Sequence, residues 1–187
     1  MLRITGGVFR GRAIKAPSGQ HTRPTQAKLR QALFNSLQPY ISDASAADLF
    51  AGSGALGFEA LSRGANSVVF VESDHNTAKL IRENARVLEV ETQIKIIENR
   101  VEKVWDKISF YGPFDLIFAD PPYALDPEIF LAGAPWGELL KPEGRLLFEW
   151  GETKKRSLSD DFEMLVKVRE KNYGDSVLTT FCLKNPS

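Results

Sequence analysis

The stretch with the clearest chemical character is Asp120-Pro121-Pro122-Tyr123, which directly follows the apolar run 114–119. Proline fixes φ and has no N–H, so two prolines cannot continue a strand ladder, and the stretch predicts a stiff loop at the carboxyl end of a buried strand. The loop offers a carboxylate, bare backbone carbonyls and a flat ring. These groups suit the binding of an amino group on a planar heterocycle, because the acceptors take its N–H hydrogens and the ring stacks on the base. A rigid turn with Tyr123 as a partly buried spacer is the structural alternative.

A second motif is the glycine-rich stretch from Asp48 to Gly57, which follows another short apolar run. Its glycines at 52, 54 and 57 have the spacing of the dinucleotide-binding fingerprint, and Glu72 lies 20 residues beyond Gly52, where an acid can bind both hydroxyls of a ribose. The glycines alone admit NAD. S-adenosylmethionine also requires a carboxylate near its amino group, and Asp48 is placed for that role. As alternatives, Asp48 caps the turn and Glu72 is an exposed acid at a strand end.

The elements that must position these motifs alternate along the chain. Apolar runs predict strands, and segments of helical periodicity separate them. The final two strands are joined through Asn172-Tyr173-Gly174-Asp175, which indicates a hairpin. The expected strands are 46–50, 68–71, 94–97, 114–119, 145–149, 162–169 and 176–183, and the expected helices are 54–63, 74–90, 101–109 and one within 126–140.

This order predicts an α/β fold with a mainly parallel sheet covered on both faces and an antiparallel edge. In such sheets ligands bind outside the carboxyl ends of the strands, at the point where the strand order reverses. Strands 46–50 and 114–119 flank that crevice, so both motifs are expected to face one site. An acceptor-rich slot there suits methyl transfer to an exocyclic amine better than hydride transfer.

The first 42 residues carry seven Lys or Arg residues and no Asp or Glu, whereas the rest of the chain holds 17 basic and 24 acidic residues. Residues 2–15 are punctuated by glycines and predict a hairpin, and Thr25 is the expected N-cap of a helix that Pro39 ends. A one-signed segment on an acidic body is typical of a phosphate-binding surface. Its candidate phosphate contacts are Arg3, Arg10, Arg12 and Arg23; a solvated basic arm is the alternative.

Composition sets further limits. No apolar run approaches the roughly 20 residues that a membrane span needs, and the N-terminus does not resemble a signal peptide. One cysteine, Cys182, and two histidines predict neither an internal disulfide nor a metal cluster. A reducing cytoplasmic setting is therefore expected, and nothing demands more than a monomer. We expect a single domain over 1–187, in which a basic hairpin and helix extension (1–42) precedes a Rossmann-like core (43–187).

The motifs occur in an order that resembles the RsmD family, bacterial class I methyltransferases that modify one guanine of 16S ribosomal RNA at N2. The resemblance covers nearly the whole chain; its N-terminal motifs are specific to the family, and the two central ones are shared with many amino-group methyltransferases. It is carried by Arg3-Ile4-Thr5-Gly6-Gly7, Arg10-Gly11-Arg12, Arg23-Pro24-Thr25, Leu33-Phe34-Asn35, Asp48–Gly57 and Asp120–Tyr123.

The resemblance implies a Rossmann-like class I fold with a seven-stranded sheet, a C-terminal antiparallel hairpin and a basic N-terminal hairpin arm. It implies S-adenosylmethionine as cofactor and, as partner, 16S rRNA in the 30S small ribosomal subunit or an assembly intermediate. Asp120, Pro121, Pro122 and Tyr123 would hold the target guanine. The residues implied to bind the cofactor are Asp48, Phe50, Gly52, Gly54, Glu72, Ser73, Asn99 and Arg100, and those implied to bind RNA are Arg3, Arg10, Arg12, Arg23 and Thr25.

Family members often carry Asp or Asn followed by Ala after the third strand, where the adenine binds; this chain has Arg100-Val101 there, with Asn99 one residue earlier. The adenine contact then falls to Asn99 or to backbone N–H groups. Thr25 and Asn35 are implied to line the cofactor or base pocket, and a helix cap and a helix surface are the alternative roles.

Other functions are compatible with parts of the pattern. An adenine-N6 DNA methyltransferase would use the same Asp-Pro-Pro-Tyr loop, although no separate target-recognition domain is apparent. An NAD-dependent oxidoreductase would use the glycine turn alone. A non-catalytic RNA-binding assembly factor would keep the fold without turnover.

Overall fold

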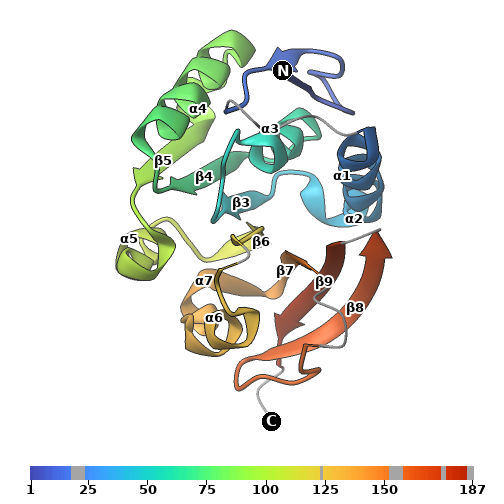
Figure 1. The fold of residues 1–187 in the computed structure, drawn as a ribbon, viewed down its shortest axis with the longest axis vertical. Coiled ribbons are helices and arrows are strands. Elements are labelled where there is room, and N and C mark those ends of the chain that lie inside the picture. The colour runs from blue at the N-terminus through green and yellow to red at the C-terminus, as the bar shows by residue number, and fades with distance from the viewer. Residues whose placement is uncertain (18–23, 123, 152–157, 174–175, 185–187) are drawn as a thin grey trace.

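The computed structural model describes residues 1–17, 24–122, 124–151, 158–173 and 176–184, and in the helix that begins at Pro24 it describes side chains from Ala27 onward. A seven-stranded sheet in the order β5-β4-β3-β6-β7-β9-β8 forms the centre of this part of the chain (Figure 1). The prediction of a mainly parallel α/β sheet with an antiparallel C-terminal hairpin is confirmed.

The central parallel strands are almost continuously buried, as the apolar runs predicted for a sheet covered on both faces. Asp48, the last residue of β3, lies opposite Phe70 of β4 on one side and Phe118 of β6 on the other. The chain leaves β3 toward β5 and returns to β6 on the opposite side, so the β3–β6 border is the switch point where ligands bind. These strands are β3 (Ser45–Asp48), β4 (Ser67–Glu72), β5 (Ile94–Glu98), β6 (Phe114–Ala119) and β7 (Leu140–Gly151).

The antiparallel edge consists of β9 (Ser176–Leu183), paired with β7, and β8 (Leu165–Tyr173), paired with β9. The register between β6 and β7 shifts early: Phe114 lies opposite Leu140, but Leu116 lies opposite Arg145. The predicted strand 145–149 is therefore the regular part of a longer β7.

Helices cover both faces of the sheet. On one face, aromatic side chains join helices to strands, with ring centroids 5.4 Å apart for Phe34 and Phe118 and 5.0 Å apart for Phe58 and Phe70. The helices of this face are α1 (Pro24–Ser36), α2 (Gln38–Ile41), α3 (Ala55–Ser62) and α4 (His75–Leu88). The opposite face is covered by α5 (Trp105–Ser109), α6 (Pro127–Gly133) and α7 (Trp136–Leu139); the short 3-10 helices are η1 (Glu91–Gln93) and η2 (Val101–Lys103).

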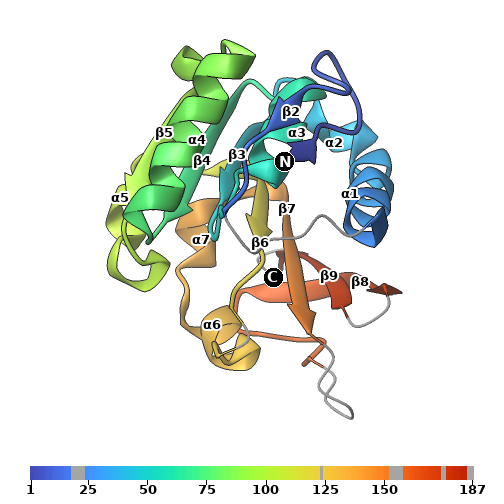
Figure 2. The ribbon, with the colours of Figure 1, turned by 45° about the horizontal axis from the view of Figure 1, so that its top comes forward.

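The predicted N-terminal hairpin is present. Strands β1 (Leu2–Arg3) and β2 (Ala13–Ile14) pair antiparallel, and Ile4 and Ile14 are buried. The hairpin lies against α3 and α4 in both ribbon views (Figures 1 and 2). The backbone N–H of Val8 donates to the Ser62 carbonyl at 2.7 Å, which ties the hairpin to the end of α3.

Two expected boundaries in the next segment are wrong. Helix α1 begins at Pro24, so Thr25 lies inside the helix and is not its N-cap. The helix ends at Ser36, and Pro39 lies in the first turn of α2, where a missing N–H costs no hydrogen bond. Within the described ranges, no helix is long and apolar enough to cross a membrane.

Candidate active site

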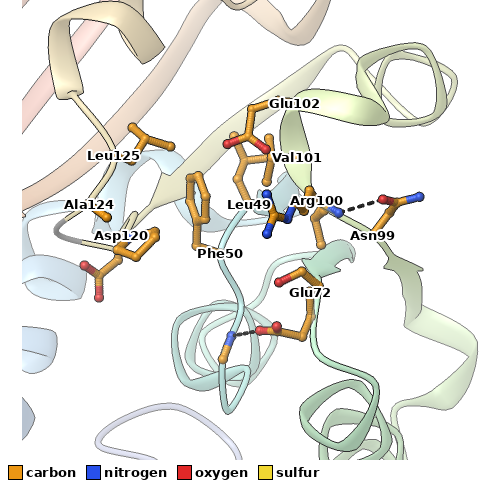
Figure 3. Close-up of a pocket in the computed structure, with 14 residues that line it drawn as sticks. Leu49, Phe50, Glu72, Asn99, Arg100, Val101, Glu102, Asp120, Ala124 and Leu125 are labelled. Carbon is orange, nitrogen blue, oxygen red and sulfur yellow. Dashed lines mark hydrogen bonds between the residues drawn. The ribbon is translucent and has the colours of Figure 1, made fainter.

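A cavity of about 680 Å³ opens at the carboxyl edge of the parallel strands (Figure 3). Its size is in the range of small-molecule sites. Phe50 stands between Asp120 on one side and Arg100 on the other. The lining residues come from the segments after β3, β4, β5 and β6: Leu49, Phe50, Gly52, Val71, Glu72, Ser73, Asn99, Arg100, Val101, Glu102, Asp120, Pro122, Ala124 and Leu125.

The glycine loop is held by both neighbouring strands. The N–H of Leu49 donates to the Phe118 carbonyl at 2.9 Å, and the N–H of Ala51 donates to the Val71 carbonyl at 3.0 Å. Gly54 has φ of 76° and precedes α3, and a Cβ there would lie 2.6 Å from the Phe58 ring. A side chain at Gly54 would thus be strained and would clash, so its absence serves the tight turn and packing of α3.

Glu72 fixes this loop from the next strand. Its Oε2 accepts the Gly52 N–H at 2.8 Å (Figure 3), and its Oε1 accepts the Asp74 N–H at 2.8 Å. The carboxylate is half-buried, and each oxygen keeps a lone pair available. Glu72 can therefore brace the glycine loop and still accept hydrogen bonds from a ligand hydroxyl in the cavity.

Asp48 lies beneath the loop, 3% exposed, and its Oδ2 accepts the Gly57 N–H at 3.1 Å. Burial raises the pKa of this carboxyl to about 7, opposed by the Gly57 hydrogen bond and assisted by the charge of Glu72. No Lys or Arg among the described residues forms an ion pair with Asp48. A cationic group of a ligand would stabilise the ionised form.

Asp120 lies at the mouth of the cavity, and its carboxylate points away from Arg100 in Figure 3. The residue is exposed, and it contributes to the wall of the cavity. Desolvation, followed by the charges of Glu149 and Asp48, raises its pKa to about 7. The carboxyl thus changes between hydrogen-bond donor and acceptor near neutral pH.

Beyond β5, the cavity is lined by Asn99 and Arg100, which the resemblance implies as cofactor-binding residues. The Asn99 Oδ1 accepts the Arg100 backbone N–H at 2.8 Å, so this oxygen and this N–H already pair with each other (Figure 3). The side-chain amide of Asn99 keeps two donors. Both residues are exposed, and Glu102 lies beside them on the same rim.

The structure thus brings most of the predicted site residues to one cavity. Those that line it are Phe50, Gly52, Glu72, Ser73, Asn99, Arg100, Asp120 and Pro122, whereas Asp48, Gly54 and Pro121 lie outside the lining set. Tyr123 lies outside the described residues. The lining residues that were not predicted as site residues are Leu49, Val71, Val101, Glu102, Ala124 and Leu125. The last two follow the Asp-Pro-Pro-Tyr loop directly, and that proximity was the available signal.

The predicted RNA-binding arginines lie on the N-terminal arm and at its end. Arg3, Arg10 and Arg12 are exposed, while Arg23 and the side chain of Thr25 lie outside the described residues. Arg12 donates to the Val87 carbonyl at the end of α4, which ties the arm to that helix, and Arg3 Nη1 donates to the Gly11 carbonyl at 2.7 Å, which braces the hairpin itself. The Arg10 side chain has no such partner in the described chain.

One of the seven basic residues of this segment is internal. Arg30 is 7% exposed, and its Nε lies 3.4 Å from Oε2 of the fully buried Glu59. Glu59 also accepts the Thr5 N–H at 2.8 Å and the Arg63 Nε at 2.8 Å. This network joins the arm, α1 and α3, and it removes Arg30 from the surface that could meet RNA.

The chain is similar to a known protein family over almost its whole length. The family described as "Conserved hypothetical protein 95" matches residues 2–182. The YlbH protein of Bacillus subtilis is 32% identical over 92% of this chain and 94% of its own length. Ribosomal RNA small subunit methyltransferase D of Haemophilus influenzae is 38% identical over 65% of this chain, a match that spans 64% of that protein.

Solved structures agree with the fold. The structure of YhhF from Escherichia coli, a protein described as a methyltransferase, is 30% identical, covers 98% of both chains and has a TM-score of 0.79. At 13% identity, a methyltransferase structure, SMU.776, complexed with SAH shares the fold alone, with a TM-score of 0.64 over 87% of this chain and 50% of that one. On the family match and these relatives, the chain belongs to the family described as "Conserved hypothetical protein 95", the RsmD family of methyltransferases.

Proposed function

We propose that the protein transfers the methyl group of S-adenosylmethionine to the exocyclic N2 amine of a guanine in 16S rRNA of the small ribosomal subunit. Membership of the family and the names of the relatives, which specify small-subunit ribosomal RNA, support the substrate class. The single observation that carries the proposal is that one cavity has both the glycine-loop residues and the Asp120–Pro122 loop in its wall.

Residues in the cavity wall, together with the buried Asp48 beneath the glycine loop, fit this cofactor. Glu72 has free lone pairs for ribose hydroxyls, and Gly52 allows the backbone to approach a ligand closely. Asp48 is an acid whose raised pKa reflects an unpaired buried charge, so the cofactor's ammonium group would complement it. When bound, S-adenosylmethionine supplies a methyl group that its sulfonium already activates for in-line transfer.

Asp120 orients the target amine. As a carboxylate it accepts one N–H of the guanine amine, and the Pro121 carbonyl accepts the other, which favours a pyramidal nitrogen with its lone pair free. The enzyme's contribution is then mainly orientation of the nitrogen at near-attack distance. The product proton can leave after transfer, so Asp120 does not have to act as a full base during the reaction.

The base must be unpaired or flipped out of its helix to reach this loop, and the ring of Tyr123 stacks on it. The N-terminal arm contacts the surrounding phosphates. Arg3 and Arg10 are exposed on this arm, and Lys28 is exposed on α1. Their charges act on the RNA backbone and are independent of sequence, so they set affinity and register while the loop performs the chemistry.

The test uses labelled S-adenosylmethionine and small-subunit particles that lack the modification. After incubation, the RNA is digested to nucleosides and analysed by mass spectrometry. N2-methylguanosine is the expected product. Formation of N6-methyladenosine, or of no product on free 16S rRNA, on an assembly intermediate or on complete subunits, would refute the proposal; equilibrium binding of NAD in place of S-adenosylhomocysteine would point to oxidoreductase chemistry.

A further inference from the structure

Glu149 of β7 lies beside the candidate base-binding loop, although it was not among the predicted site residues. Ala119 of β6 lies opposite Phe148 of β7, so Asp120 and Glu149 are each one residue further along two paired parallel strands. Neighbouring strands are about 4.8 Å apart. The two acids therefore occupy adjacent positions at the carboxyl edge of the sheet.

Their side chains also share a face. Ala119 and Phe148 belong to the core under α5, α6 and α7, and side chains alternate along a strand. Glu149 therefore points to the opposite face, as do Leu147 before it and Leu178, its pairing partner in β9. This is the face covered by α1, α2, α3 and α4, and Ile4 and Ile14 of the basic arm pack into the same core.

The electrostatics support this proximity. The charge of Glu149 is one of the causes of the raised pKa of Asp120. Glu149 itself is half-buried, and its burial raises its pKa against the effect of a hydrogen bond from the Ser176 side chain. Among the described residues no Lys or Arg is paired with it. The Ser176 hydrogen bond holds one end of the carboxylate and leaves acceptor capacity for a ligand.

Two adjacent carboxylates match one nucleobase edge. Guanine presents two donors side by side, N1–H and the N2 amine, whereas adenine presents the N6 amine beside N1, which is an acceptor. A carboxylate is an acceptor only, so it binds a ring N–H and is repelled by a ring nitrogen lone pair. The Asp120 loop alone fits either amine, and a second acceptor at the N1 position distinguishes the two bases.

We infer that Glu149 accepts the N1–H of the target guanine while Asp120 accepts from its N2 amine, so that Glu149 selects guanine over adenine. This inference rests on the proposed guanine-N2 activity. Glu149 determines base specificity in the same site, because the amine that receives the methyl group is bound by Asp120.

The experiment uses a base that keeps the N2 amine and lacks N1–H. Small-subunit particles are reconstituted with 16S rRNA that carries guanosine or 2-aminopurine riboside at the methylated position, which product mapping identifies. The wild-type protein is expected to prefer guanosine by at least about 100-fold in kcat/KM, because a site built for a donor leaves its acceptor facing a lone pair when the donor is missing. Equal rates on the two bases would overturn the inference without any variant.

The variant Glu149→Gln tests the residue itself. Glutamine keeps the shape and can donate to the bare N1 of 2-aminopurine, so the preference for guanosine should shrink to within about 10-fold. Comparing the ratio of the two rates between proteins cancels the intrinsic reactivity of the bases. Glu143→Gln, an exposed acid at the other end of β7, is the matched control and should keep the wild-type ratio.

Two further measurements separate the possible failures. The affinity for S-adenosylhomocysteine should be unchanged in Glu149→Gln, because Glu149 is outside the residues that line the cofactor cavity. An unchanged guanosine preference in this variant would overturn the role of Glu149 alone. Absence of any guanosine methylation by the wild-type protein would instead refute the proposed function.

Discussion

The buried carboxyl of Asp48 gives a quantitative prediction about both stability and cofactor binding. Asp48 is 3% exposed, and its pKa is raised from 3.8 to about 7. The folded protein therefore retains a proton that the unfolded chain loses between these values. Ionised Asp48 therefore lowers the free energy of unfolding. This loss of stability is absent below pH 3.8, increases between pH 3.8 and pH 7, and is constant above pH 7.

Asp48→Asn removes the titration while keeping an oxygen that can accept the Gly57 N–H. One pKa unit corresponds to about 1.4 kcal/mol, so the penalty relieved by the variant is about 2 kcal/mol at pH 5 and about 4 kcal/mol at pH 8. The variant should gain stability relative to wild type, and the gain should grow by about 2 to 3 kcal/mol between these two pH values.

Urea unfolding of both proteins at pH 5, 6, 7 and 8 measures this difference in the absence of cofactor. Titration with S-adenosylhomocysteine at pH 8 supplies the second readout, because the lost negative charge should weaken binding of the ammonium group by about 10- to 100-fold. A stability difference that does not change with pH, or unchanged affinity at pH 8, would refute the assignment of Asp48 as a buried acid that meets the cofactor's amino group.

Three further predictions concern the loop, the arm and the network behind it. At saturating cofactor, kcat/KM for RNA should rise about tenfold per pH unit up to pH 7 and level off above it, because only ionised Asp120 accepts the amine. Glu149→Gln removes a neighbouring negative charge, so the rising part of its pH profile should lie at lower pH than in the wild-type protein. A flat pH profile in both proteins would contradict the role of Asp120. Arg10→Ala combined with Lys28→Ala should weaken RNA binding and reduce the slope of log affinity against log salt by about one to two, with cofactor affinity unchanged; an unchanged slope would show that the arm does not meet phosphates. Glu59→Gln leaves the buried Arg30 and the largely buried side chain of Arg63 without their counter-charge and should lower the free energy of unfolding by about 3 kcal/mol in denaturant titrations, whereas a change below about 1 kcal/mol would mean that this network does not hold the arm.

Much of the site could be predicted because parallel strands end at one edge of a sheet. The Gly52–Gly57 turn and Asp120 follow two apolar runs, and their placement on adjacent strands at the switch point made their convergence predictable. Glu72 was predictable in the same way from its position at the end of the next strand. Local composition and chain order were sufficient for these residues.

Glu149 was not identified from the sequence, although it is the last residue of the predicted strand 145–149. It lies inside the apolar run Leu146-Leu147-Phe148-Glu149-Trp150, and only the pairing of Ala119 with Phe148 places it beside Asp120. The register between β6 and β7 shifts after Phe114, and periodicity along one strand carries no information about such a shift. Long-range pairing, which the sequence of a single strand does not encode, determines this part of the site.

The N-terminal arm shows a similar limit of prediction from sequence. Charge counting placed all seven basic residues of 1–42 in one electrostatic surface, but Arg30 turns inward to Glu59, 29 positions further along the chain. Nothing in the local sequence distinguishes Arg30 from the exposed Lys28 two residues earlier. The helix start at Pro24 was also missed, because threonine is a preferred N-cap residue and Thr25 therefore predicts a helix that begins after it.

The central claim is that Asp120 holds the amine that receives the methyl group, and single-turnover kinetics of Asp120→Ala test it most directly. Wild-type protein and variant are each saturated with labelled S-adenosylmethionine, mixed with unmodified small-subunit particles and sampled for methylated nucleosides, while calorimetry measures S-adenosylhomocysteine binding in parallel. The account predicts that the variant binds the cofactor product within about threefold of wild type and forms N2-methylguanosine at least about 1,000-fold more slowly. Transfer at the wild-type rate, or a loss of cofactor binding that accounts for the whole defect, would contradict it.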